Sequence, residues 1–179
     1  MTDPVDNRGP AAYDILRYLE SSAFRDLAGT HLSARIPVSR LLLNKLAADA
    51  LRRTSAPVRN VDVQPHDGDR FDLVVTVTWP FVPPLRIAFV VEVQPRFPES
   101  PVLVLRWSLM GGVGTIASRF VSSLDRLPHG VRLDGDRLML DVEALAASRQ
   151  LDHLLPFLSG LEVHTAEGQI VFDVALDVR

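Results

Sequence analysis

Hydrophobic residues recur at helical spacing in one dense segment, Ile36–Arg53. Its leucines and alanines cover most of the circumference of a helix and leave only a thin polar seam. Pro37 fits the first turn of such a helix, and Ser39 can cap it. Because a helix this apolar has to be covered on most sides, the pattern predicts a long central helix over residues 37–53.

The pattern changes after Pro57, where apolar and polar residues begin to alternate. Alternation of this kind is typical of antiparallel strands that pack one face and turn the other toward water. Aspartate–glycine pairs and proline-rich segments separate the alternating runs and predict hairpin turns and stiff loops, with a last hairpin around residues 166–168. The predicted strands are Phe71–Trp79, Leu85–Val93, Leu103–Leu109, Leu138–Val142, Leu161–Thr165 and Gln169–Val178.

The rest of the chain predicts shorter elements around this framework. Residues 1–9 are polar and predict a disordered tail, and apolar spacing over residues 10–29 predicts an extra amphipathic helix. A short strand is expected at 30–36 and a second helix at 112–126, packed beside the central one. Short helical segments are expected at 143–148 and 151–158. Residues 10–179 are therefore expected to form a single α+β domain, in which a highly curved antiparallel sheet wraps around the long central helix.

Composition narrows the function classes. The chain has 179 residues and a net charge of −3, which argues against nucleic acid as a partner because such proteins need a basic face. It has no cysteine, so disulfides and thiolate chemistry are excluded. No apolar run reaches membrane-spanning length, and the first residues lack the apolar core of a signal peptide. We expect a cytoplasmic protein whose contact with a membrane is at most peripheral.

Motifs for catalysis, metals and cofactors are missing from the sequence. The five histidines are scattered without the spacing of a metal site, and the aspartate–glycine turns lack the spacing of a calcium loop. The glycines at 111–114 precede a predicted helix, but the lysine of a phosphate-binding loop is absent. No serine lies in a nucleophile elbow. We therefore predict no catalytic residue, no metal and no cofactor, and expect the protein not to be an enzyme.

Apolar and aromatic residues on the strand faces remain as the candidates for a function. Plain core packing is the ordinary interpretation of such residues. The functional interpretation is an elongated apolar gap between the central helix and the sheet, which takes acyl chains or similar ligands. The candidate lining residues are Leu42, Leu46, Leu73, Val75, Val77, Phe89, Val91, Leu105, Trp107 and Phe120.

The order of these elements resembles the tubular lipid-binding (TULIP) superfamily, especially its small bacterial members. The resemblance covers about residues 30–179 and depends on three segments, Pro37–Leu46, Asp134–Val142 and Leu161–Val174. It implies a curved sheet rolled around a long helix, with apolar ligands between them and no catalytic set. The chain departs from this pattern in lacking an export signal or lipobox, and the helix predicted at 10–29 is not shared.

Two functions follow from this sequence. The leading hypothesis is non-catalytic binding or carriage of a lipid or another elongated apolar ligand, in a groove between helix 37–53 and the sheet. The alternative is a structural or assembly module whose core is filled by its own side chains. In that case exposed Val74, Val90 and the proline-rich loops mark the surface for a protein partner or for a second copy of the chain.

Overall fold

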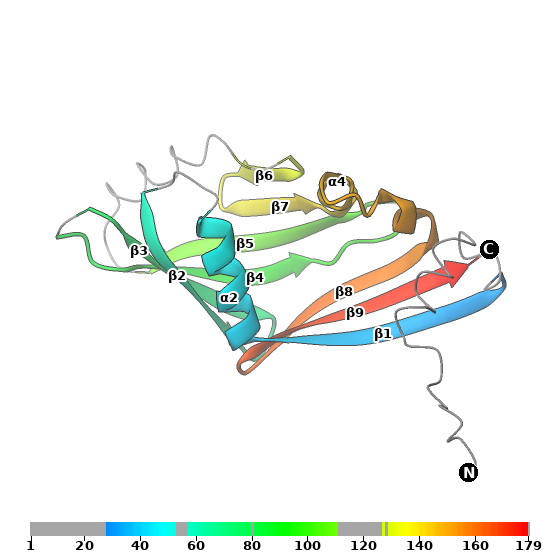
Figure 1. The fold of residues 1–179 in the computed structure, drawn as a ribbon, viewed down its shortest axis with the longest axis horizontal. Coiled ribbons are helices and arrows are strands. Elements are labelled where there is room, and N and C mark those ends of the chain that lie inside the picture. The colour runs from blue at the N-terminus through cyan, green and yellow to red at the C-terminus, as the bar shows by residue number, and fades with distance from the viewer. Residues whose placement is uncertain (1–27, 53–56, 80, 111–126, 128, 179) are drawn as a thin grey trace, which may run out of the picture.

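A computed structural model describes residues 28–52, 57–79, 81–110, 127 and 129–178 of the chain. Two antiparallel sheets account for most of these residues (Figure 1). The elements are β1 (Thr30–Ser39), α2 (Arg40–Leu51), β2 (Val58–His66), β3 (Arg70–Val77), β4 (Leu85–Val93), β5 (Val102–Met110), β6 (Val131–Asp134), β7 (Arg137–Asp141), α4 (Val142–Ser148), the 3-10 helix η2 (Asp152–Phe157), β8 (Leu158–Ala166) and β9 (Gln169–Val178).

The larger sheet has six strands in the order β2-β3-β4-β5-β7-β6, and the smaller one has three in the order β1-β9-β8. Figure 1 shows the two sheets meeting at the tip of the β8–β9 hairpin and running apart toward the other end. The predicted strands all appear, and the acidic–glycine segments form the turns between β2 and β3 and between β6 and β7. The predicted short helical segments correspond to α4 and η2.

The core lies where the inner faces of the two sheets meet. Apolar residues at alternate positions of β3, β4 and β5 point to this face, and Val163 of β8 and Ile170 of β9 pack against them from the smaller sheet. The side chains that fill the core therefore come from strands of both sheets. The buried members are Val75, Val77, Leu85, Ile87, Phe89, Leu103, Leu105, Val163 and Ile170.

Side-chain hydrogen bonds fix the corner between the sheets. The amide of Gln94 donates to the carbonyl of Val163 at 2.7 Å and accepts from its N–H at 2.9 Å, as a neighbouring strand would. The hydroxyl of buried Thr165 donates to the carbonyl of His66 at 2.6 Å and accepts from the Arg70 N–H at 2.7 Å. These bonds satisfy backbone groups at the ends of β2, β3 and β8 and hold the sheets at a defined angle.

The predicted sheet wrapped around a long central helix is wrong. The helix α2 has 12 residues, none of them buried, and Pro37 lies in β1 rather than in a helical turn. Leu41, Leu42 and Leu46 are 82%, 45% and 56% exposed. The smaller sheet, through Val163 and Ile170, packs on the face of the larger sheet that the helix was expected to cover. The high density of leucines in this segment therefore does not indicate burial.

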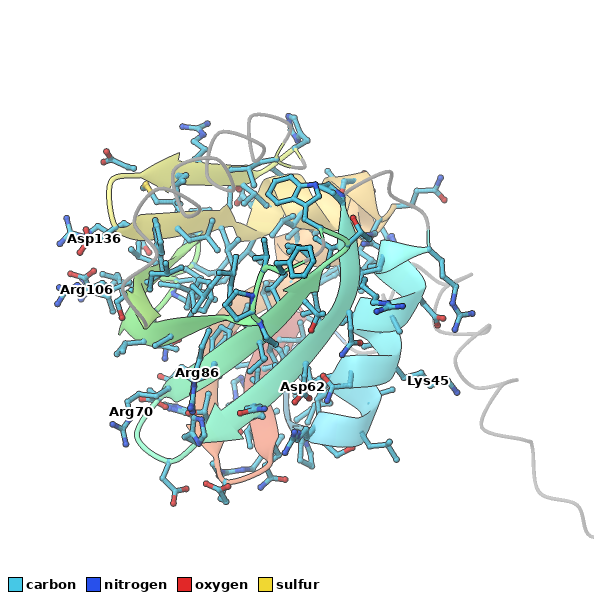
Figure 2. All side chains as sticks on the ribbon, turned by 90° about the vertical axis from the view of Figure 1, so that its left-hand side faces the viewer. Lys45, Asp62, Arg70, Arg86, Arg106 and Asp136 are labelled. Carbon is cyan, nitrogen blue, oxygen red and sulfur yellow. The ribbon has the colours of Figure 1, made fainter. Side chains whose placement is uncertain are left out.

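Polar residues of α2 bond the helix to the edge strand β2, and Leu43 packs against the core. Asn44 accepts a hydrogen bond from the Val63 N–H at 2.6 Å and donates to Asp62 at 2.6 Å. Arg40 forms an ion pair with the same aspartate at 2.7 Å, and Figure 2 shows Asp62 lying between the strand and the helix. The side chain of Ser39 caps the helix as predicted, by accepting from the Leu42 N–H.

Several other predictions fall on residues outside the described part of the chain. These are the tail at 1–9, nearly all of the helix at 10–29, and the helix at 112–126 with the candidate ligand residue Phe120. Within the described residues, no helix is long and apolar enough to cross a membrane.

Candidate ligand-binding hollow

An apolar hollow of about 320 Å³ opens on the inner face of the six-stranded sheet. Its floor is formed by β2 to β5, and residues of β6 and β7, together with Leu51 at the end of α2, complete the wall. Every described lining residue is aliphatic or aromatic. They are Leu51, Val58, Val61, Leu73, Val75, Ile87, Phe89, Trp107, Leu109, Leu127, Val131, Leu133 and Leu138.

Strand register explains why these side chains gather. Directly opposed residues of antiparallel strands point to the same face of the sheet. The residue opposite each lining residue on the neighbouring strand therefore points to the same side. Val61 opposes Val75, and Phe89 opposes both Phe71 and Trp107. The rings of Phe71 and Phe89 stack with their centroids 5.0 Å apart. The floor of the hollow is therefore a set of apolar rows crossing the strands.

The indole nitrogen of Trp107 is buried, and no described group accepts a hydrogen bond from it. It is not exposed in the hollow, whose surface is entirely apolar. No ionisable side chain contributes to the described lining, and the hollow is suited to contact with apolar groups rather than to acid–base chemistry.

The structure brings together only part of the candidate lining. Leu73, Val75, Phe89 and Trp107 line the hollow. Val77 and Leu105 are buried in the core on the same side, and Val91 packs against that core. Leu42 and Leu46 are exposed on α2, away from the described lining.

Sequence reasoning did not assign the contributions of β2 and β6 to the lining. A register shift between Val58 and Asn60 breaks the alternation in β2, so that Val58 and Val61 are three positions apart although both line the hollow. The strand β6 has only four residues, too few for alternation to be recognised. Ile87 and Leu109 did carry a signal, because they share the alternating apolar faces of the candidates Phe89 and Trp107, and Leu138 belongs to a predicted alternating strand.

The opposite face of the same sheet carries a polar cluster. Buried Asp72 accepts hydrogen bonds from the Nε of Arg86 and from a ring nitrogen of His66, each at 2.9 Å. Burial disfavours the charged carboxylate, but the bonds from Arg86 and His66 outweigh it, so the pKa of Asp72 is lowered. Figure 2 shows Arg70 near Arg86, and both lie along the same polar surface of the sheet. The cluster keeps a buried charge satisfied in the sheet.

Within the described ranges, no three histidine, aspartate or glutamate side chains gather as a metal site would require. Comparison with protein-family models, curated proteins and solved structures gives no significant match for this chain. The apolar hollow is therefore the feature from which a function is proposed.

Proposed function

We propose that this protein binds the apolar part of a lipid, or of a similar elongated molecule, in the hollow on the inner face of the six-stranded sheet. The ligand would lie against strands β2 to β5 and the end of α2, not along the whole length of the helix. The observation that carries this proposal is an apolar hollow of about 320 Å³, a volume at the lower end of the range for small-molecule sites.

Partial burial of the lining residues supports this proposal. Several of them, among them Leu73, Trp107 and Leu138, are only half-buried although they lie against the buried core. Protein interiors normally pack as densely as organic crystals, so an unfilled apolar space leaves contacts unmade. A ligand chain placed there would supply these contacts.

The expected affinity is moderate. Each buried methylene contributes about 0.8 kcal/mol, so a segment of about eight carbons contributes roughly 6 kcal/mol before the cost of association. This corresponds to a dissociation constant of tens of micromolar or weaker for a single chain. Binding assays should therefore use micromolar protein and ligand.

Fluorescence of Trp107 provides a test at the site. The chain has two tryptophans, and Trp79→Phe leaves Trp107 as the only one. We expect a fatty acid brominated along its chain to quench this variant in a saturable manner, and the unbrominated acid to compete. In the reciprocal variant, Trp107→Phe, the remaining Trp79 should not show saturable quenching. Equal quenching of both variants, or none of either, would contradict the proposal.

A filling substitution tests the hollow without relying on fluorescence. Val61→Phe places a larger side chain among the lining residues, and we expect it to weaken fatty-acid binding about tenfold or more. Because the ring enters an existing space, the variant should avoid the destabilisation of about 1–3 kcal/mol that overpacking a filled core causes. Val74→Phe is the matched control, since Val74 lies on the opposite face of β3 beside Asp62. Loss of stability with unchanged binding in Val61→Phe would mean that the space is already filled.

A further inference from the structure

The outer strand of the small sheet is exposed on both faces and along one edge. The strand β1 pairs only with β9, so its other edge is unpaired in the described structure. Residues 31–37 are all exposed, among them Leu32 at 39% and Ile36 at 48%. A long exposed edge strand with apolar side chains is a template for pairing with another strand, and proteins normally shield such edges.

The register shows which backbone groups are available. The Arg40 N–H donates to the Gly168 carbonyl at 2.8 Å, which continues the β1–β9 ladder past Ser39 and Gln169. Hydrogen bonding alternates along an antiparallel strand, so even-numbered residues of β1 turn their backbone groups to β9. Odd-numbered residues turn theirs to the free edge. Pro37, which lacks an N–H, is one of the odd positions, as is usual for a proline in an edge strand.

We propose that β1 pairs with the β1 strand of a second copy of this chain, antiparallel and with the two-fold axis at Ala34. In this register Leu32 of one copy lies opposite Ile36 of the other, and the two exposed apolar side chains cover each other. The N–H groups of Ser33 and Arg35 donate to carbonyls of the second copy. The small sheets of the two copies then form one continuous sheet.

Charge and apolar pairing select this register over its neighbours. Moving the axis to Arg35 places two guanidinium groups opposite each other, which is unfavourable. Moving it to Ser33 places Leu32 opposite Ala34 and Ile36 opposite Thr30, so the two large apolar side chains no longer cover each other. With the axis at Ala34, Arg35 faces Ser33 and His31 faces Pro37. Each of the two basic side chains keeps its own aspartate, Asp177 for His31 and Asp173 for Arg35.

Proline at an outward position tests the edge. Ser33→Pro removes an N–H that no other described group uses, and the bond is lost twice across the axis. We expect it to weaken self-association at least about tenfold, measured by sedimentation velocity over a range of concentrations. Ser33→Ala keeps the N–H and should associate like the parent chain. Thermal unfolding of both variants at concentrations below dimerisation should agree, which shows that the fold is retained.

A single cysteine tests the register. The chain has no cysteine, so Ala34→Cys introduces a unique thiol. Opposed residues of a non-hydrogen-bonded pair lie about 4.5 Å apart at their Cα atoms, within the range that a disulfide spans. We expect rapid oxidation to a covalent dimer, and none for Thr30→Cys at the far end of the strand.

Three results would overturn the proposal. These are a monomer at every concentration, a dimer insensitive to Ser33→Pro, and a dimer in which Cys at position 34 does not cross-link. A monomer at every concentration would mean that the edge of β1 pairs with a strand of another protein or with another segment of the same chain. Either of the other two results would mean that the dimer contact lies elsewhere. None of these measurements involves the apolar hollow, so their failure is separable from failure of the proposed ligand binding.

Discussion

Replacing Asn44 by alanine tests how α2 is held. The side chain accepts from the Val63 N–H at 2.6 Å and donates to Asp62 at 2.6 Å, while Val63 is only 8% exposed. Loss of the acceptor leaves a buried N–H unpaired, at about 1–3 kcal/mol, and loss of the second bond adds about 1 kcal/mol. The higher helix propensity of alanine returns about 0.5 kcal/mol. We expect a net loss of about 1.5–3.5 kcal/mol.

Thermal and urea unfolding measure this loss directly. For a chain of this size, 1 kcal/mol corresponds to about 2–4 °C in Tm, so Asn44→Ala should lower Tm by about 3–14 °C. The control is Lys45→Ala, one residue along the helix, whose side chain points away from the sheet in Figure 2. We expect this control to change stability by less than about 0.5 kcal/mol. Equal Tm values for the two variants would refute attachment of the helix through Asn44.

Two further substitutions test the ion pairs of Glu92 with Arg106 and Arg137, and the turn at Gly130. Hydrogen bonds from Arg137 and Arg106 lower the pKa of Glu92 to about 2, from an ordinary value of 4.5. The carboxylate therefore stabilises the fold above pH 4.5, and this contribution is lost as the pH falls toward 2, so Glu92→Gln should flatten the decline of Tm over that interval. Gly130→Ala should unfold at lower denaturant than Gly135→Ala. Both glycines have positive φ, but only at Gly130 would a Cβ come within 2.9 Å of another side chain, that of Ala144.

The sequence predicted the strands well because their burial is one-sided. Alternation in β3, β4 and β5 reflects which apolar side chains reach the core, and acidic–glycine pairs marked the turns. In β9, by contrast, the adjacent residues Ile170 and Val171 are both buried. Of the candidate lining residues on β3, β4 and β5, Leu73, Val75, Phe89 and Trp107 line the hollow. Val77 and Leu105 lie in the core on the same side, and Val91 packs against it. Local periodicity is sufficient to predict the position of such residues, because the alternation within each strand indicates which face is buried.

The error over α2 has a different cause. A leucine-rich helical pattern shows that a segment can bury several sides, but it does not show whether another element is available to cover them. Here the three-stranded sheet packs on the face that the helix was expected to fill, and α2 is joined to β2 by Asn44 and Arg40. These two residues belonged to the polar seam that the sequence interpretation set aside. Contacts between distant segments decided the outcome, and hydrophobic spacing does not encode them.

Isotope-filtered NMR would test the central claim, ligand binding in the hollow, most directly. With a ¹³C-labelled fatty acid and methyl-labelled protein, we expect intermolecular NOEs from the acyl chain to the methyl groups of Val61, Val75 and Leu138. Contacts confined to the exposed leucines of α2, Leu42 and Leu46, would contradict the account. So would the absence of any intermolecular NOE at saturating fatty acid.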